Sequence, residues 1–472
     1  MSEAFARIAQ PLSRAVLVFT LGCLVTWTAV FPFDPYIRNA FIGGRAVVMT
    51  AIMAVTKPTP DVWRFIEPET FEGGVVTLTE DASDAVRLIT VGESARLIDR
   101  EGNELHRWAI DYADLPESEG NEKVSAGLAG SDGLYWQRAT VLPDGDLIVM
   151  INHTGLSPTG VGMMRLDRES RPVWVRHDHY HHDFDVDAAG YVHVLDQRER
   201  AQAPAPFDAL IGPVLDEGLQ VLSPAGEPVR RVSFLDAFAD SPYASLVDSH
   251  ARIDWHSWGD YLHSNNVDVA DAATAARFAM VEPGQVLISL RDIDTIALLD
   301  LEEETITWAM IGAWHRQHDP DFLPNGNILI FDNKGDWARG GKSRVIEVDP
   351  ATGGIVWSFP DGPDGEPLWS DYRAEQEVVP GTAEAEAGAG AQTILVNAFT
   401  TGRLLEVDRA GRVLWEYRCP DRHPEKPKVA CSVMSATAFA RADLPFLDDG
   451  GVMTLETADA VTLRPGGGSA RR

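Results

Sequence analysis

From about residue 80 onward, short runs of alternating apolar and polar residues recur, each bounded by a turn rich in glycine, proline or aspartate. Alternation with a period of two residues is typical of β-strands with one buried face. Asn-Gly, Asp-Gly and Ala-Gly pairs between the runs supply the positive φ angles that tight hairpins need. The clearest unit reads FLPNGNILIFDN at 322–333, followed by SRVIEVDPATGGIVWSF at 343–359. The pattern predicts antiparallel sheets over most of the chain.

This unit of sequence recurs six times along the chain. Four short strands per unit, repeated at regular intervals, are typical of the blades of a β-propeller. We therefore predict an all-β, six-bladed β-propeller over residues 80–435. An open array of β-sandwiches is the structural alternative, and it does not require such regular repetition. The recurring segments lie at 86–110, 140–175, 184–232, 284–311, 322–359 and 392–417.

The N-terminal region has a different pattern. Residues 15–33 form an uncharged apolar run that is about as long as a bilayer core requires, and Arg7 and Arg14 precede it. We expect a cytoplasmic N-terminus at 1–14, a transmembrane anchor at 15–33, and an interfacial helix with a linker at 34–79. The orientation predicts a single-pass inner-membrane protein with its C-terminal domain in the periplasm. A cleaved signal peptide is the alternative. Residues 436–472 are expected to form a closing segment and a flexible tail.

Charge and cysteine content exclude several classes of protein. The 472 residues include 71 acidic and 40 basic side chains, which gives a net charge of −31. A surface this acidic repels phosphate backbones, so nucleic acid is not an expected partner. The chain has 3 cysteines, which excludes a four-cysteine zinc site. Cys419 and Cys431 frame a short loop after the last unit, and we expect a disulfide between them in an exported domain.

Histidines open the first strand of several units, in HYHHDFDV at 179–186, LHSNNVDV at 262–269 and QHDPDFL at 317–323. The first strand of each propeller blade lines the central channel, so we expect His182, His263 and His318 to converge there. Converging imidazoles suit nucleophilic or acid–base chemistry, because their pKa lies near neutrality. Two alternatives stay open, namely structural His-Asp pairs between strands and a three-imidazole zinc site.

Arginines of the same units are candidates for holding an anion. Arg291, Arg339 and Arg344 have forked cations that suit a sulfuryl or phosphoryl oxyanion. Arg291 and Arg344 are alternatively strand-end cations paired with the abundant acids.

Residues 255–350 resemble the bacterial arylsulfotransferase family. The resemblance is carried by GDYLHSNNVDV (259–269), VLISLRDIDTIALLDLEEETITWAMIG (286–312) and QHDPDFLPNGNILIFDN (317–333). It implies a periplasmic six-bladed propeller that transfers a sulfuryl group from a phenolic sulfate ester to a phenol. It also implies a reaction through a sulfated channel histidine, without PAPS, a metal or a soluble cofactor. The expected partners are therefore small phenolic sulfates and phenols, and a homo-oligomer is an open alternative.

The resemblance assigns roles to individual residues. His263 and His318 match two active-site histidines of the family, and Arg339 is the nearest match to the family's arginine. These three are the expected catalytic residues. The expected substrate-binding residues are His182, Asn265, Arg291, Asn333 and Arg344.

The chain departs from the family pattern at the start of the last blade. The family's sulfated histidine lies there, whereas this chain reads WSDYRAEQEVV at 369–379. Two functions therefore stay open, an active sulfotransferase in which another group takes that role, and a non-catalytic propeller that binds a ligand or a protein. The segment VDPATGGIVWSF at 348–359 is similar to a quinoprotein docking motif, but it occurs once in full.

Overall fold

The computed structural model describes residues 63–66, 70–110, 133–153, 160–210, 213–250, 259–361, 367–381, 392–423 and 426–448. All of them belong to one compact unit, Thr59–Arg472. The predicted membrane anchor at 15–33 lies outside these residues. Within them, no helix combines the length and the apolar character needed to cross a membrane.

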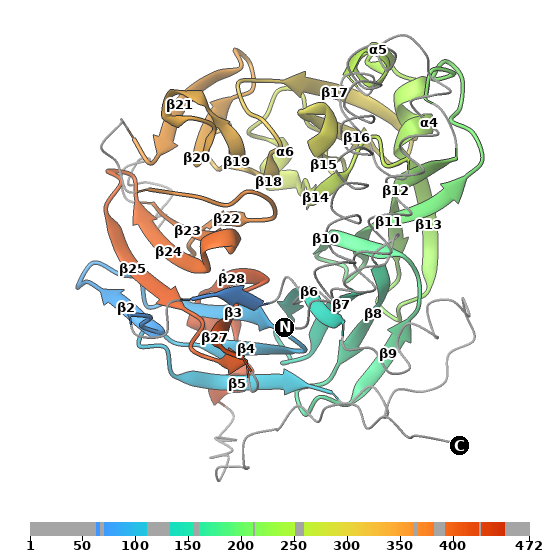
Figure 1. Ribbon diagram of the computed structural model, residues 1–472. Coiled ribbons are helices and arrows are strands. Elements are labelled where there is room, and N and C mark those ends of the chain that lie inside the picture. The colour runs from blue at the N-terminus through green and yellow to red at the C-terminus, as the bar shows by residue number, and fades with distance from the viewer. Residues whose placement is uncertain are drawn as a thin grey trace, which may run out of the picture. The chain divides into compact units, whose positions relative to one another are not determined.

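Six antiparallel sheets form the blades of a β-propeller, which confirms the predicted fold (Figure 1). Each innermost strand contacts the innermost strand of the next blade, and the series closes on itself. The first three blades, from the innermost strand outward, are as follows. Blade 1 contains β28 (Ser435–Phe439), β3 (Val86–Val91), β4 (Ser94–Ile98) and β5 (Glu104–Ala109). Blade 2 contains β6 (Leu134–Val141), β7 (Leu147–His153), β8 (Gly160–Leu166) and β9 (Pro172–Arg176). Blade 3 contains β10 (Tyr180–Val186), β11 (Val192–Arg200), β12 (Val214–Leu222) and β13 (Pro228–Ser233).

The remaining three blades follow the same order. Blade 4 contains β14 (Ser264–Val269), β15 (Val286–Leu290), β16 (Thr295–Asp300) and β17 (Thr305–Ile311). Blade 5 contains β18 (His318–Phe322), β19 (Ile328–Asp336), β20 (Lys342–Asp349) and β21 (Gly354–Phe359). Blade 6 contains β22 (Glu375–Val378), β23 (Thr393–Ala398), β24 (Arg403–Asp408), β25 (Val413–Arg418) and an added outer strand, β2 (Gly74–Leu78).

Both ends of the propeller sequence contribute strands to the ring closure. The late strand β28 pairs with β3 as the innermost strand of blade 1, and the early strand β2 pairs with β25 of blade 6. The sheets therefore extend beyond the predicted range of 80–435 at both ends. Each pairing satisfies the hydrogen-bonding groups of a strand edge that would otherwise be open. An additional three-stranded sheet contains β1 (Trp63–Phe65), β27 (Lys426–Cys431) and β26 (Arg422–His423), which are close in sequence to the closing strands β2 and β28.

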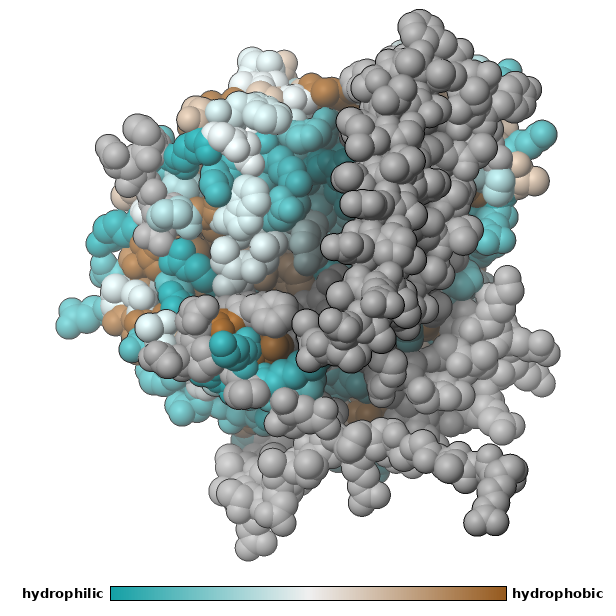
Figure 2. All heavy atoms as spheres, viewed as in Figure 1, coloured by the Kyte–Doolittle hydropathy of each residue, from teal (hydrophilic) through white to brown (hydrophobic). Residues whose placement is uncertain are grey.

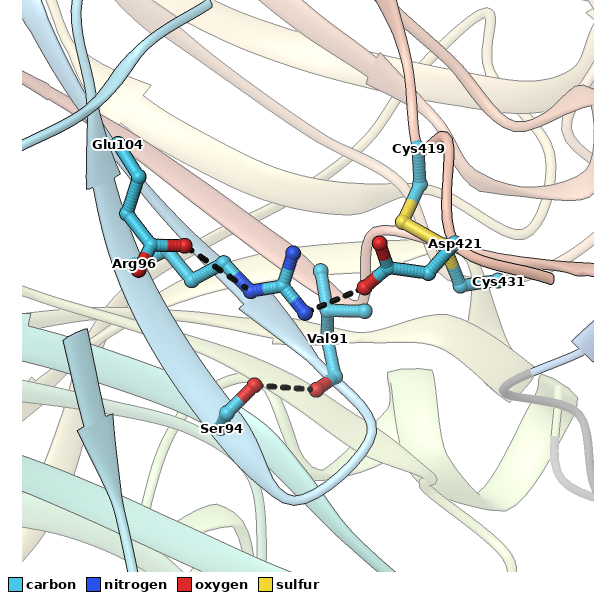
Figure 3. Close-up of a disulfide and its surroundings, with 7 residues drawn as sticks. All are labelled: Val91, Ser94, Arg96, Glu104, Cys419, Asp421 and Cys431. Atoms are coloured by element: carbon cyan, nitrogen blue, oxygen red, sulfur yellow. Dashed lines mark hydrogen bonds and ion pairs between the residues drawn. A yellow bond between two sulfur atoms is a disulfide. The ribbon is translucent and has the colours of Figure 1, made fainter. Parts of the chain in front are cut away.

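A disulfide holds the closing segment, as shown in Figure 3. Cys419 and Cys431 are bonded, with their Cα atoms 5.7 Å apart and a sequence separation of 12. Within the loop, Asp421 forms an ion pair with Arg96 of β4. Nε of the same arginine lies 3.8 Å from Oε2 of Glu104 on β5. The loop that leads to β28 is therefore fixed covalently to blade 6 and electrostatically to blade 1.

Short helices occur between blades 3 and 4 and within blade 4. Helices α4 (Phe234–Ala239) and α5 (Ala244–His250) follow β13, and α6 (Ala272–Ala275) follows β14. Ser233 caps α4 by accepting a hydrogen bond from the backbone of Asp236. The apolar side chains of α4 belong to the core shared by blades 3 and 4, so this insertion packs into the propeller. On the face drawn in Figure 2, the described surface is mainly hydrophilic with scattered apolar side chains.

Candidate active site at the propeller axis

The inner strands of four blades carry β-bulges at the same end, and these bulges turn polar side chains toward the axis. The interruptions in pairing lie at Trp136/Arg138 in β6, Tyr180/Phe184 in β10, Ser264/Asn266 in β14 and His318/Asp321 in β18. A bulge re-aims a side chain that regular pleating would bury within the sheet. The residues around these bulges, with the segment before β22 and the residue before β28, line a cavity. Its lining consists of Gln137, Arg138, His182, Asp183, Asn265, His318, Asp319, Arg373, Ala374, Glu375 and Met434.

One half-buried cation pairs with three carboxyl groups in the lining of this cavity. Nε of Arg138 lies 2.5 Å from Oδ1 of Asp183, and its Nη1 lies 3.2 Å from Glu375 and 3.7 Å from Asp319. The four side chains come from blades 2, 3, 5 and 6, and each lies three residues before the last residue of its inner strand. Histidine-led motifs do not indicate this set. The shared register, not the residue type, is the signal that could have found it.

Burial keeps part of this cluster protonated near neutral pH. Removal from water raises the pKa of Asp183 to about 7, although Arg138 opposes the rise. Burial likewise raises the pKa of Asp319 to about 7, again against the effect of Arg138. Each carboxyl also accepts a backbone hydrogen bond from a neighbouring strand, at Val267 and Gln376, both at 2.8 Å. The cluster therefore ties the inner strands of five blades together.

His318 has a defined tautomer. Its Nδ1 lies 2.7 Å from Oδ1 of Asn333 on β19. The amide nitrogen of Asn333 donates to the carbonyl oxygens of Ser370 at 2.9 Å and Arg373 at 2.8 Å, which determines which end of the amide is the oxygen. Because that oxygen can only accept, Nδ1 of His318 carries the hydrogen. Nε2 of the neutral ring therefore keeps its lone pair.

The ring of His318 is neutral at physiological pH. Burial lowers the pKa of His318 to about 3, and the positive charge of Arg291 acts in the same direction. Hydrogen bonds from the ring to Asn333 and to the carbonyl of Arg316 only partly offset that effect. A neutral imidazole with a free lone pair is competent as a nucleophile.

His263 and His182 lie next to each other, with ring centroids 4.8 Å apart and an edge-to-face geometry. Nδ1 of His263 lies 2.5 Å from Oδ2 of Asp260, so this ring has a carboxylate partner. Nδ1 of His182 faces Nδ1 of His181 at 2.7 Å, so one hydrogen is shared between the two nitrogens. Burial lowers the pKa of His182 well below its usual value, and the charge of His263 adds to this.

Among the expected substrate-binding residues, two more lie close to the histidines. Asn265 lines the cavity and donates to the carbonyl of Gln317 at 2.9 Å, while its own Oδ1 is buried without a hydrogen-bond partner. The charge of Arg291 lowers the pKa of His318 and of His182, and its Nε donates to the carboxylate of Asp292 at 2.7 Å. Its backbone N–H donates to the carbonyl of His263 at 3.1 Å.

The other two arginines are engaged elsewhere in blade 5. Arg339 donates to the carbonyl of Pro360 at 3.1 Å and pairs with Asp336 at 3.2 Å. Arg344 donates to Asp332 at 2.8 Å and to the carbonyl of Ala313 at 2.6 Å. Neither side chain belongs to the described lining of the cavity. The structure therefore does not bring Arg339 or Arg344 to the histidines.

The segment before β22, where the sequence has no histidine, contributes Arg373 to the cavity. Its φ of 56° lies in the left-handed region, as do the φ angles of His182 and His263 in the corresponding segments. The guanidinium lies over the rings of Tyr135 and Phe399, with 5.1 Å and 4.9 Å to the centroids, and donates to Tyr135 Oη at 3.0 Å. An arginine thus stands at the last blade where the family resemblance leads us to expect an imidazole.

A comparison with protein-family models decides the family. The model described as Arylsulfotransferase (ASST) matches residues 138–419, which is more than half of the chain. The chain belongs to the arylsulfotransferase family. The matched region begins at the cavity residue Arg138 and ends at Cys419, so it contains all three channel histidines. A comparison with curated protein sequences gave no match.

Solved structures with a similar arrangement of strands are distant from this arylsulfotransferase-family chain. A protein of unknown function from Bacteroides caccae has 10% sequence identity and a TM-score of 0.43, and the match covers 71% of this chain and 94% of that chain. Virginiamycin B lyase from Staphylococcus aureus has 6% identity and a TM-score of 0.32, with coverage of 61% and 70%. Hydrazine synthase from Kuenenia stuttgartiensis has 11% identity and a TM-score of 0.38, with coverage of 72% and 78%. Similarities this weak say nothing about function.

The zinc alternative does not fit the described geometry. Among the described residues, one group of histidine, cysteine and acidic side chains is compact enough to hold a metal ion, namely Cys419, Asp421 and Cys431. The two sulfur atoms of that group are bonded to each other, so no thiolate remains to act as a ligand. The three channel histidines do not form such a group.

Proposed function

We propose that this arylsulfotransferase-family protein transfers a sulfuryl group from a phenolic sulfate ester to a phenolic acceptor at the propeller axis. The observation that carries the proposal is that His182 lines one cavity with His318 and lies beside His263, with 4.8 Å between the ring centroids. The charge of Arg291 acts on both His182 and His318. Neutral imidazoles supply a nucleophile and a proton acceptor, and the guanidinium offsets the charge of a sulfate ester.

In this proposal, the surroundings of each side chain determine its role in the reaction. His182, Asn265 and His318 contact the sulfuryl group, because all three line the cavity. His263 moves the proton, because its carboxylate partner Asp260 stabilises the ring when it is protonated. Arg373 contributes a second cation from the last blade. The chemistry requires no metal and no soluble cofactor.

The cellular setting is part of the same proposal. An uncharged N-terminal run with arginines before it would anchor the protein in the inner membrane and direct the propeller to the periplasm. A disulfide joins Cys419 and Cys431, as expected in an oxidising compartment. Small phenolic sulfates and phenols reach such a site without crossing the inner membrane.

The test is the release of phenol from a sulfate ester. The purified full-length chain is mixed with 4-nitrophenyl sulfate and a phenol acceptor, and nitrophenolate is followed by its absorbance. We expect release that depends on the acceptor and that His263→Ala and His318→Ala each abolish. His193→Ala is the matched control, since this buried histidine of blade 3 bonds Asp187 at the opposite end of the blade. No release from folded protein over a range of donors would overturn the proposal.

The alternative is a propeller that binds an anionic ligand without turnover. The presence of Arg373 in the last blade, in place of an imidazole, favours it. Equilibrium binding of a phenolic sulfate, measured by calorimetry and unaccompanied by phenol release, would identify this second function.

A further inference from the structure

The absence of a histidine in the last blade raises the question of which group receives the sulfuryl group. The candidates that border the axis are His182, His263 and His318. A nucleophile requires a ring nitrogen that carries a lone pair and faces the substrate. The hydrogen-bond partners of each ring determine which of the three meets this requirement.

His318 is the ring whose partners fix the reactive nitrogen. Asn333 is held in one orientation by two backbone carbonyls and accepts from Nδ1 of His318 at 2.7 Å. The carbonyl of Arg316 lies 3.2 Å from the same nitrogen and accepts as well. Both partners therefore place the hydrogen on Nδ1, and Nε2 is left as the lone-pair atom.

The other two rings are placed differently. The facing nitrogens of His181 and His182 share one hydrogen, so the tautomer of His182 is not fixed by its partners. Nδ1 of His263 lies 2.5 Å from Oδ2 of Asp260, and a ring with a carboxylate partner suits proton transfer. His263 is also absent from the described lining of the cavity, whereas His318 is part of it.

We propose that Nε2 of His318 is the nucleophile that accepts the sulfuryl group, with Asn333 as the positioning residue that fixes its tautomer. This inference rests on the proposed function and names the group that carries its covalent step. It assigns the nucleophile to blade 5, because the last blade of this chain has no histidine.

The proposed step balances as follows. The lone pair of Nε2 attacks sulfur, the N–S bond forms, and the S–O bond to the aryl group breaks, so the phenolate leaves with the bonding pair. The product is a sulfonated imidazolium whose positive charge strengthens the hydrogen bond from Nδ1–H to Asn333. The acceptor phenol then gives its proton to His263, its oxygen attacks sulfur, and the N–S pair returns to Nε2. The proton on His263 passes to the released phenolate or to water.

The surroundings of His318 suit both halves of this cycle. The preceding residue, Gln317, is held by blade 4, because its side chain donates to Ser289 at 3.1 Å and its carbonyl accepts from Asn265 at 2.9 Å. The pKa of the ring, lowered by burial, keeps the nitrogen unprotonated before attack. The same low basicity makes the ring a good leaving group in the second half.

The decisive experiment traps the covalent intermediate. The full-length protein is mixed with 4-nitrophenyl sulfate labelled at sulfur, without acceptor, and quenched in alkali. Peptide mass spectrometry then locates the added SO3 group. We expect one group per chain, on His318, and loss of both label and phenol release by about 10³-fold or more in His318→Ala. His193→Ala is expected to label as the wild type does.

Chemical rescue separates nucleophile from scaffold. In His318→Gly, added imidazole should restore phenol release and yield free N-sulfoimidazole, which a structural role cannot produce. Label on His182 or His263, or release without any labelled protein, would overturn the inference and leave the proposed function intact. No release at all would overturn the proposed function, and the inference with it.

The positioning role of Asn333 has its own readout. Asn333→Leu removes the acceptor opposite Nδ1, and we expect the rate of labelling to fall about 10²-fold with little change in KM. Asn333→Asp keeps an acceptor there but loses both donors to the carbonyls, and it should retain most of the labelling rate. If Asn333→Asp and Asn333→Leu lose the same activity, Asn333 acts on structure and not on the tautomer.

Discussion

Oδ2 of Asp260 lies 2.5 Å from Nδ1 of His263, at the lead-in to the inner strand of blade 4. Burial alone would disfavour the carboxylate, but the charge and hydrogen bond of His263 hold the pKa of Asp260 below its usual value. The pair is therefore a carboxylate with an imidazole that can take a proton on Nε2.

Replacing Asp260 tests this pair. In Asp260→Asn the partner of Nδ1 loses its charge, so a protonated His263 is no longer stabilised. We expect kcat for sulfuryl transfer to fall about 10²-fold, with a smaller effect on labelling of His318 by the donor. Stopped-flow measurement of both half-reactions would check this. An equal loss in both halves would argue that Asp260 supports the fold of the lead-in segment instead.

Arg291 offers a test of donor recognition. Arg291→Gln removes the cation beside His182 and His318. We expect KM for an anionic sulfate ester to rise about 10- to 100-fold, the factor for losing a charge-assisted hydrogen bond. Arg165→Gln is the control, since Arg165 pairs with Asp146 at 2.7 Å on blade 2. An unchanged KM in Arg291→Gln would remove Arg291 from the binding site.

Acidic groups along the axis predict an unusual dependence of stability on pH. Burial raises the pKa of Asp268 to about 8 and that of Glu377 to about 8. Their folded-state pKa exceeds the unfolded value of about 4, so the folded state binds more protons. The stabilising effect is complete below the unfolded pKa and is lost as the pH rises through about 8.

We therefore expect the free energy of unfolding to fall between about pH 5 and pH 9, measured by urea titration. Asp268→Asn, which can still accept from the backbone of Phe322, should flatten this slope and be more stable than the wild type at pH 8. Asp271→Asn, at an exposed helix cap, should keep the wild-type slope. A stability that rises over this range would contradict the prediction.

The ring closure contains a fully buried ion pair between blades 1 and 6. Arg87 of β3 pairs with Glu406 of β24, and both side chains are 0% exposed. Glu406→Leu leaves the guanidinium buried without its partner, and we expect a loss of about 3–5 kcal/mol in the free energy of unfolding. Adding Arg87→Met should recover most of that loss.

An exposed pair between blade 6 and the segment that leads from β2 to β3 is the control. Arg412 and Asp81 lie 3.2 Å apart with side chains that are 64% and 62% exposed. Asp81→Ala should change stability by less than about 1 kcal/mol. A loss as large as that of Glu406→Leu would mean that burial does not explain the effect of the inner pair.

The disulfide in the closing loop predicts sensitivity to reductant. Cys419→Ser together with Cys431→Ser should lower the free energy of unfolding by about 2–4 kcal/mol, because the bond restricts the unfolded chain. Thermal unfolding with and without dithiothreitol checks this, since the double variant should no longer respond to the reductant. Equal melting temperatures for the oxidised and reduced wild type would contradict it.

The repeats predicted the blades well, because turn chemistry and alternation are local properties of the sequence. Each predicted unit corresponds to one sheet, and the three histidine-led segments contain the inner strands β10, β14 and β18. The strands that close the ring were harder to predict. Gly74–Leu78 and Ser435–Phe439 pair with partners several hundred residues away, and their own sequences do not indicate which strands they pair with.

The site was predicted only in part, again because contacts between residues distant in sequence cannot be read from local motifs. Family motifs pointed to His263 and His318, but the roles of Asp260 and Arg138 depend on contacts that form in three dimensions. Arg138 pairs with Asp183, Asp319 and Glu375 from three other blades. Arg339 shows the reverse, since its position after Phe-Asp-Asn matched the family while its guanidinium bonds the carbonyl of Pro360.

The placement of β28 has a consequence for the order in which the site is made. Met434, which lines the cavity, directly precedes the strand that completes blade 1. During synthesis the histidines of blades 3 to 5 emerge long before this residue, so a nascent chain has an axis that is open on one side. The wall of the cavity is complete only after β28 has been translated and has paired with β3. Chains that stop short of that strand lack one wall of the cavity even when every histidine is present.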